Sequence, residues 1–94
     1  MKFWQSISWA EADQLTEIAR FAENAGFYGV INSEHLFLTR NTKSPYPYSE
    51  DGKMNHALDY AYPDMFVSFA AMAAVTTTLR FSSSVYLLPL RNPI

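Results

Sequence analysis

Residues 22–35 have the sequence Ala-Glu-Asn-Ala-Gly-Phe-Tyr-Gly-Val-Ile-Asn-Ser-Glu-His, and this stretch decides the fold. Gly26 supplies the left-handed residue that commonly ends a helix. Residues 27–33 form an apolar run of strand length that ends in polar residues, as expected for a strand buried on both faces. The few residues between helix and strand therefore predict the return half of a βαβ unit.

The residues before this stretch predict a strand followed by a helix. Phe3, Trp4 and Ile7 favour a strand over residues 1–7. Ser8-Trp9-Ala10-Glu11 has the capping-box pattern, which predicts that a helix starts at Ser8. The apolar residues of this helix recur at three- and four-residue spacing and predict one stripe that faces a core: Leu15, Ile18, Ala19, Ala22 and Ala25.

A long segment without a hydrophobic period follows the second strand. Residues 34–62 contain Pro45, Pro47 and Gly52, and we expect a loop there. A loop of this length in a compact domain is usually functional or disordered. Its tyrosines favour an ordered, packed loop over a solvated one: Tyr46, Tyr48, Tyr60 and Tyr62.

The C-terminal part of the sequence predicts a helix, a strand and the beginning of another helix. Pro63 and Asp64 suit the first turn of a helix that frays at the threonines of residues 76–78. A third strand covers residues 79–88, and residues 90–94 resemble the start of a third helix. The predicted buried side of the second helix is Phe66, Phe69, Ala70, Ala73 and Ala74.

This order of elements predicts the α/β class with parallel strands and right-handed crossovers. Such units fit either an open doubly wound sheet or the start of a (β/α)8 barrel. No Gly-x-Gly-x-x-Gly turn follows the first strand, so the dinucleotide-binding fingerprint is absent.

Composition excludes several classes of protein. The 94 residues carry a net charge of −2, which argues against a nucleic-acid binder, and their 49% hydrophobic content argues against disorder. The longest apolar stretch, residues 65–75, is about half of the roughly 20 residues that cross a bilayer. No signal peptide is recognisable and there is no cysteine, which excludes disulfides and thiolate chemistry, so we expect a cytoplasmic protein.

Two histidines are candidates for chemistry. His35 and its neighbour Glu34 directly follow the second strand, and ligands of parallel α/β folds meet the protein at the carboxyl ends of strands. An imidazole there can act as general acid or base, or it can simply bond a backbone carbonyl at the loop entry. His56 lies near Asp51 and Asp59, but no ligand spacing is seen, and we favour no metal site.

Together the segments resemble the luciferase-like monooxygenases, the superfamily of flavin- and deazaflavin-dependent (β/α)8 barrels. The resemblance covers nearly the whole chain and implies one domain over residues 1–94, the first three βα units of the barrel. The segments that carry it are residues 22–30, 33–37, 44–49 (Ser-Pro-Tyr-Pro-Tyr-Ser), 51–53, 73–81, 84–85 and 88–93.

The resemblance also implies roles for individual residues. His35 matches the active-site histidine, and Glu34 matches an acidic residue that lies beside the cofactor in members that use coenzyme F420. Those members more often have Asp there, which leaves F420 and FMN both open. Ser84 and Val85 match a position that often has a cis peptide behind the flavin ring, and Leu87 lies near a cofactor-lining position.

The length departs from the family pattern, because a complete barrel has around 250 residues and eight strands. Three strands leave unpaired edges and uncovered apolar faces. We therefore expect a fragment, a truncated product or a chain completed by association, as a homo-oligomer or with the remainder of the barrel. The completed enzyme would bind a small-molecule substrate. The alternative is a non-catalytic oligomerising module that retains part of the cofactor site.

Overall fold

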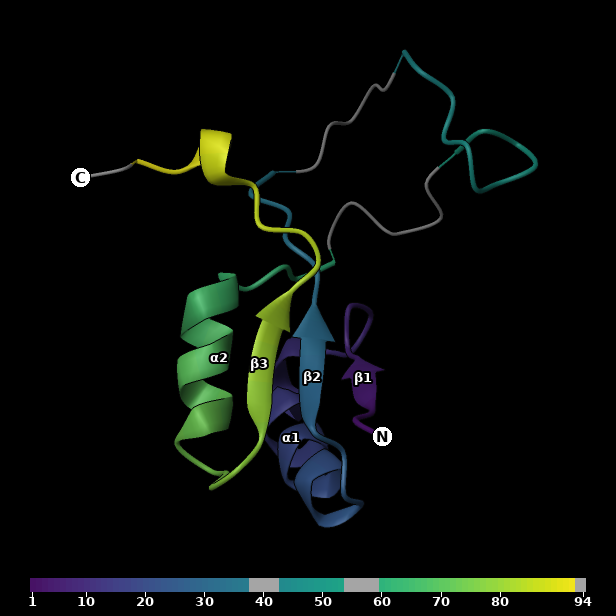
Figure 1. The fold of residues 1–94 in the computed structure, drawn as a ribbon. Coiled ribbons are helices and arrows are strands. Elements are labelled where there is room, and N and C mark those ends of the chain that lie inside the picture. Colours follow the sequence, from purple (N-terminus) through teal and green to yellow (C-terminus); the bar gives the residue numbers. More distant parts are fainter. Residues whose placement is uncertain (38–42, 54–59, 93–94) are drawn as a thin grey trace.

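The protein is described by a computed structural model that covers residues 1–37, 43–53 and 60–92. Its centre is a three-stranded parallel sheet in the order β1-β2-β3 (Figure 1). The strands are β1 (Trp4–Ser6), β2 (Gly29–Asn32) and β3 (Arg80–Ser83). The predicted α/β class and the parallel pairing are thus confirmed, although each strand is shorter than the predicted run.

β2 is the central strand and the most buried one. Val30 lies opposite Gln5 of β1 on one side and Phe81 of β3 on the other. Val30 is fully buried, whereas all three residues of the edge strand β1 are exposed. A side chain at Gly29 would collide with the ring of Trp4 and the carbonyl of Arg80, so glycine is required where the strands approach closely.

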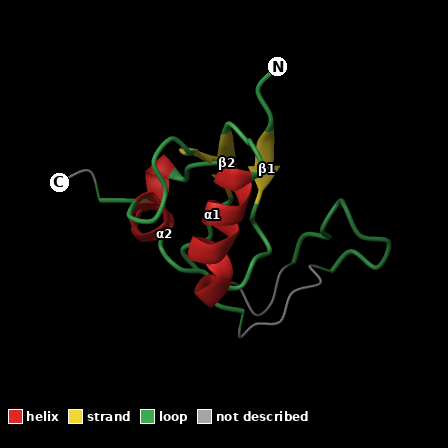
Figure 2. Ribbon diagram, turned by 90° about the horizontal axis from the view of Figure 1, so that it is seen from below, coloured by secondary structure: helices red, strands yellow, loops and turns green. Residues whose placement is uncertain are grey.

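Two helices, α1 (Leu15–Asn24) and α2 (Met65–Ala73), cover one face of the sheet. Figure 2 shows them on the same side of the strands. They close a small core between themselves and the sheet, which consists of Ile7, Leu15, Ala19, Ala22, Val30, Met72 and Leu79. Within the described ranges, no helix is long and apolar enough to span a membrane.

The start of α1 differs from the prediction. Residues 8 and 9 form a turn in which the Ala10 N–H donates to the Ile7 carbonyl at 3.0 Å. The Ile7 N–H in turn donates to the Ile31 carbonyl at 2.9 Å, so this turn belongs to the exit of β1. A 3-10 helix, Ala12–Gln14, then leads into α1 without a side-chain cap, and the predicted capping box at Ser8 is wrong.

The predicted stripe of α1 is confirmed for most of its residues. Leu15, Ala19 and Ala22 are buried and Ile18 packs partly against them. Ala25 is exposed because it caps the helix after its last turn. Gly26 follows with a φ of 83°, as predicted for the residue that stops this helix.

The predicted buried side of α2 is wrong. Its buried residues are Met65, Ser68 and Met72, whereas Phe66 is 51% exposed and the alanines at positions 70, 73 and 74 are exposed. Phe69 alone of the predicted set packs partly against the core. Because α2 is apolar on nearly every side, several faces have apolar residues at three- and four-residue spacing, and this spacing does not identify the buried face. The Ser68 hydroxyl, which donates to the Asp64 carbonyl at 2.8 Å, lets this residue be buried.

The chain beyond β3 also differs from the prediction. Instead of a strand up to residue 88, four residues, 84–87, follow the end of β3 and lead into a 3-10 helix, η2 (Leu88–Leu90). Arg91, the residue after this helix, has an extended backbone. The remainder of the predicted third helix lies outside the described residues.

A carboxylate ties the end of α1 to the start of β3. Glu23 accepts backbone N–H bonds from Thr77 at 2.9 Å, Thr78 at 2.6 Å and Leu79 at 2.9 Å. These hydrogen bonds, the Thr78 and Thr77 amides first, lower the pKa of Glu23 to about 2, although burial acts to raise it. The carboxylate therefore stays charged well below the pH at which an exposed glutamate takes up a proton.

This pKa predicts how the stability depends on pH. A lowered carboxyl pKa contributes stability that is present above the unfolded pKa and is lost as the pH falls through the folded one. We expect the melting temperature to fall between pH about 5 and about 2, and Glu23→Gln to flatten that fall. Glu17→Gln, an exposed residue of the same helix, is the control and should follow the parent protein. Parallel curves for Glu23→Gln and the parent would contradict the role of Glu23.

Candidate functional site

The carboxyl ends of β2 and β3 meet at one edge of the sheet. Figure 1 shows the chain after β2 and the chain after β3 leaving side by side at this edge, near the residues that lead into α2. Glu34 and His35 follow β2 directly after Ser33, and Ser84 follows the last residue of β3. The prediction that Glu34 and His35 lie at the carboxyl end of the second strand is therefore confirmed.

The peptide bond between Ser84 and Val85 is cis, as predicted. The Ser84 N–H still donates to the Asn32 carbonyl at 2.8 Å and continues the pairing with β2 by one residue. Val85 is 65% exposed, whereas Tyr86 and Leu87 are half-buried. The edge beyond β3 thus presents an apolar side chain to solvent.

Glu34 is buried and its carboxylate is bound on both oxygens. Only 2% of its side chain is exposed. Oε2 accepts the N–H of Leu87 at 2.8 Å, and Oε1 accepts the Nε–H of Arg91 at 2.7 Å and also contacts Arg91 Nη2. The charge is therefore paired, as a buried carboxylate requires.

Arg91 joins Glu34 to the start of α2. Its Nη1 lies 2.7 Å from Oδ2 of Asp64, the N-cap residue of α2. The other carboxylate oxygen of Asp64 accepts the N–H groups of Phe66 and Val67 at 2.9 and 3.0 Å. One guanidinium thus connects the end of β2 with the N-terminus of a helix, and we call Glu34, Asp64, Leu87 and Arg91 the Arg91 cluster.

Aromatic rings enclose the guanidinium from the side. Arg91 Cζ lies 5.3 Å from the ring centroid of Phe66 and 5.5 Å from that of Tyr86. The two rings contact each other edge-to-face at 5.4 Å. A guanidinium at this distance from a ring centroid is attracted to the ring, which adds to the ion pairs in holding Arg91 in place.

Each acid of the Arg91 cluster has a lowered pKa. Burial acts to raise the pKa of Glu34, but the hydrogen bonds from Arg91 and the Leu87 N–H outweigh it, and the pKa is lowered. The pKa of Asp64 is lowered first by the Val67 N–H and then by Arg91. Both carboxylates are therefore anionic at neutral pH.

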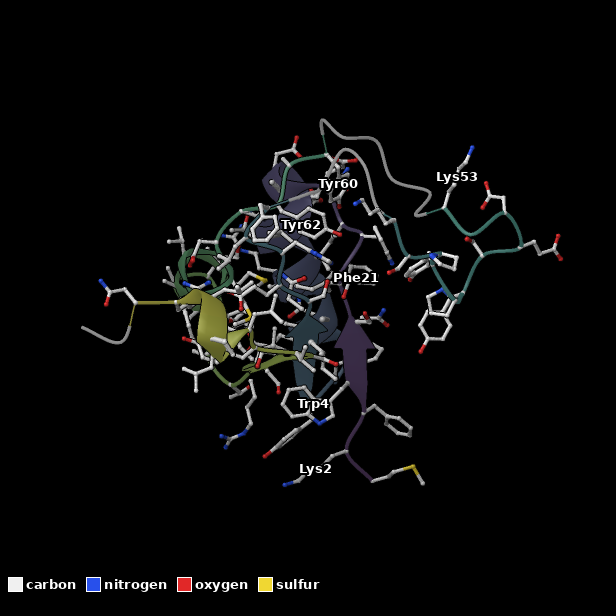
Figure 3. The ribbon with its side chains drawn as sticks, turned by 90° about the horizontal axis from the view of Figure 1, so that it is seen from above. Lys2, Trp4, Phe21, Lys53, Tyr60 and Tyr62 are labelled. Carbon is white, nitrogen blue, oxygen red and sulfur yellow. The ribbon has the colours of Figure 1, made fainter. Side chains whose placement is uncertain are left out.

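A row of rings runs from the end of β1 to the end of β2. The ring centroids of His35 and Tyr62 are 5.0 Å apart, those of Tyr62 and Tyr60 5.1 Å, and those of Tyr60 and Trp9 6.3 Å. Figure 3 shows Tyr60 and Tyr62 next to each other at this edge. The Tyr60 hydroxyl donates to the Ala10 carbonyl at 2.9 Å, which fixes the row to the chain after β1.

Burial is the main cause that raises the pKa of both Tyr60 and Tyr62. These two residues confirm the prediction that loop tyrosines are packed. Tyr48, in contrast, is 85% exposed. It belongs to a compact turn in which the Tyr46 N–H donates to the Gly52 carbonyl at 2.7 Å. The long loop therefore contains a packed part beside the sheet and a separate turn.

The other sequence candidates are His56 and the serines of β3. His56 and Asp59 lie outside the described residues. Among the residues that are described, no group of three His, Cys, Asp or Glu side chains could hold a metal ion. The half-buried serines of β3, Ser82 and Ser83, extend to the edge at which Ser84 begins the cis segment.

Sequence reasoning missed the partners of Glu34. Arg91 is 57 residues away along the chain, and no local pattern pairs the two. The sequence predicts Asp64 only as a helix-start residue, whereas the structure also makes it a partner of Arg91. The available signal was an arginine shortly after a strand whose end must lie beside Glu34.

Comparison with known proteins gave one family and a few relatives. The family model described as luciferase-like monooxygenase matches residues 3–94. Uncharacterized proteins of Mycobacterium bovis and Mycobacterium tuberculosis are each 36% identical over 76 residues, which is 81% of this chain. The chain spans about a quarter, 26%, of the length of these relatives. No solved structure matches the chain significantly.

The hydroxyl of Tyr60 should stabilise the row of rings. Tyr60→Phe removes its hydrogen bond to Ala10 and should lower the free energy of unfolding by about 0.5–1.5 kcal/mol, measured by urea denaturation. Tyr48→Phe removes the same hydroxyl from an exposed ring and serves as the control. Equal effects of the two variants would show that the hydrogen bond to Ala10 does not stabilise this edge.

Proposed function

Because the chain belongs to the luciferase-like monooxygenase family, we propose that it forms the N-terminal βα units of a flavin- or deazaflavin-dependent (β/α)8 oxidoreductase. The match over residues 3–94 carries this proposal. Sequential parallel strands with both helices on one face, as in this sheet, agree with consecutive units of such a barrel. The substrate would be a small molecule, bound in the complete protein.

The edge beyond β3 fits the flat ring system of the proposed cofactor, FMN or coenzyme F420. Val85 offers an exposed apolar side chain and Leu87 a half-buried one, next to the small side chain of Ser84. Aromatic ring systems bind in apolar sites with few polar groups. We propose that Ser84, Val85 and Leu87 form the cofactor side of the site, which is the surface that faces the ring system. Glu34 lies behind this surface, bonded to the Leu87 N–H.

The anionic tail of either cofactor needs other partners. Arg91 is already paired with two carboxylates and is not offered to a phosphate. When bound, the cofactor would supply the hydride or oxygen chemistry.

We propose His35 as the catalytic residue. It follows β2 at the same edge, and its ring contacts Tyr62. An imidazole can accept or donate a proton near neutral pH, which suits acid–base work on a substrate held above the strand ends. The row of rings gives the imidazole a fixed neighbour and so a limited set of orientations.

A second candidate function is a non-catalytic module that associates with another copy. It is favoured by an apolar groove of about 550 Å³ between the exposed edge strand β1 and α1, lined among others by Ile7, Trp9, Ile18, Phe21 and Phe27. Such a module would retain the edge beyond β3 without binding a cofactor. Cofactor binding therefore separates the two candidates.

Titration of the protein with FMN and with F420, followed by fluorescence, tests the proposal. We expect saturable binding of one of them, and Val85→Asp should weaken it about tenfold or more, because a carboxylate would lie against the ring. Val67→Asp is the matched control, since Val67 is 67% exposed on α2 and Val85 is 65% exposed. Binding of neither cofactor, or equal affinities for parent and Val85→Asp, would contradict the proposal.

A further inference from the structure

Glu34 offers almost no surface to a ligand, because its side chain is buried and both of its carboxylate oxygens already accept hydrogen bonds. Oε2 is bound by Leu87 and Oε1 by Arg91, and the side chain is 2% exposed. To reach a cofactor, the carboxylate would have to leave a guanidinium that is itself held among rings. Breaking a buried pair by removing one partner is strongly unfavourable, because the other charge is left uncompensated.

Glu34 binds both ends of one turn. Leu87 precedes η2 (Leu88–Leu90) and Arg91 follows it. The turn is closed by the Leu90 N–H, which donates to the Leu87 carbonyl at 3.0 Å, and by the Arg91 N–H, which donates to the Leu88 carbonyl at 3.1 Å. A backbone contact at the start and a side-chain contact at the end fix the turn against β2.

From this geometry we infer that Glu34 is a positioning residue: it holds residues 84–91 in place through Leu87 and Arg91 and does not touch the cofactor. The inference rests on the proposed function, since it concerns the cofactor side of the proposed site. It assigns Glu34 an indirect part in binding, with Val85 and Leu87 forming the surface that the ring contacts.

Asp64 fixes the same turn at a second point, through its ion pair with Arg91. Its carboxylate caps α2 and also binds Arg91, so the turn after β3 is attached to β2 and to α2 at once. If Glu34 loses its charge, Arg91 keeps Asp64 as an anionic partner but has no anionic partner toward β2. The weakened attachment should then be detected at the start of the turn, in the hydrogen bond of the Leu87 N–H.

Hydrogen exchange of the cofactor-free protein, measured by NMR, tests this directly. Glu34→Gln should make the Leu87 amide exchange about tenfold faster, because a neutral amide accepts more weakly than a carboxylate. The Ser84 amide, bonded to Asn32, should keep its rate within about twofold. Glu17→Gln removes a charge at an exposed position and should change neither amide. An unchanged Leu87 rate in Glu34→Gln would overturn the inference.

Cofactor affinity supplies the second measurement. Glu34→Gln and Arg91→Gln should each raise the Kd for the cofactor about tenfold. The double variant should have a Kd no higher than that of either single variant, because both substitutions break the same contact between Glu34 and Arg91. Effects that multiply, with Glu34→Gln much the larger, would mean that Glu34 contacts the cofactor itself and would overturn the inference.

The two proposals fail in different ways. If the parent protein binds neither FMN nor F420, the proposed function fails, while the Leu87 exchange rate still decides whether Glu34 holds the turn. If the parent binds a cofactor but Leu87 is insensitive to Glu34, the function stands and the positioning role is overturned.

Discussion

The buried carboxylate of Glu34 is the constraint on which the carboxyl edge of the sheet depends. A charge that is removed from water must be fully paired, and Glu34 finds its partners in the backbone of Leu87 and the guanidinium of Arg91. Both lie more than 50 residues away along the chain, at separations of 53 and 57. Residues 84–91 therefore have to return over the end of β2, where His35 also lies.

Glu23 plays the corresponding part at the other end of β3. Its carboxylate binds the amides of residues 77–79, directly before the strand, while Glu34 binds the Leu87 amide after it. β3 has only four residues and one neighbouring strand in the described sheet. Two carboxylates from the α1–β2 half of the chain thus determine where this short strand begins and how the chain leaves it.

The sequence was informative where local chemistry decides the structure. Gly26 ends α1 because its positive φ favours glycine, and β2 follows from an apolar run with a polar end. Glu34 and His35 could be placed at the carboxyl edge because they directly follow this apolar run in the sequence. The rule that ligands bind at strand ends then made them candidates for function. The family resemblance supplied the cis bond at Ser84, which no local pattern would have suggested.

Sequence reasoning was wrong where competing local patterns are equally good. The Ser8 and Glu11 spacing fits a capping box, but the hydrogen bond between Ala10 and Ile7 keeps Ser8 in the exit turn of β1. The face of α2 was misassigned because apolar residues surround the helix and the buried stripe includes the polar Ser68. The pairing of Glu34 with Arg91 is tertiary, so it could be found only once β2, β3 and α2 had been placed together.

A crystal structure of the protein with FMN or F420 bound tests the central claim most directly. The account predicts that the ring system lies against Val85 and Leu87, with His35 at the same edge and the Glu34 carboxylate still bound to Arg91 and the Leu87 N–H. A ring bound elsewhere, or a Glu34 carboxylate that has left Arg91 to bond the cofactor, would contradict it.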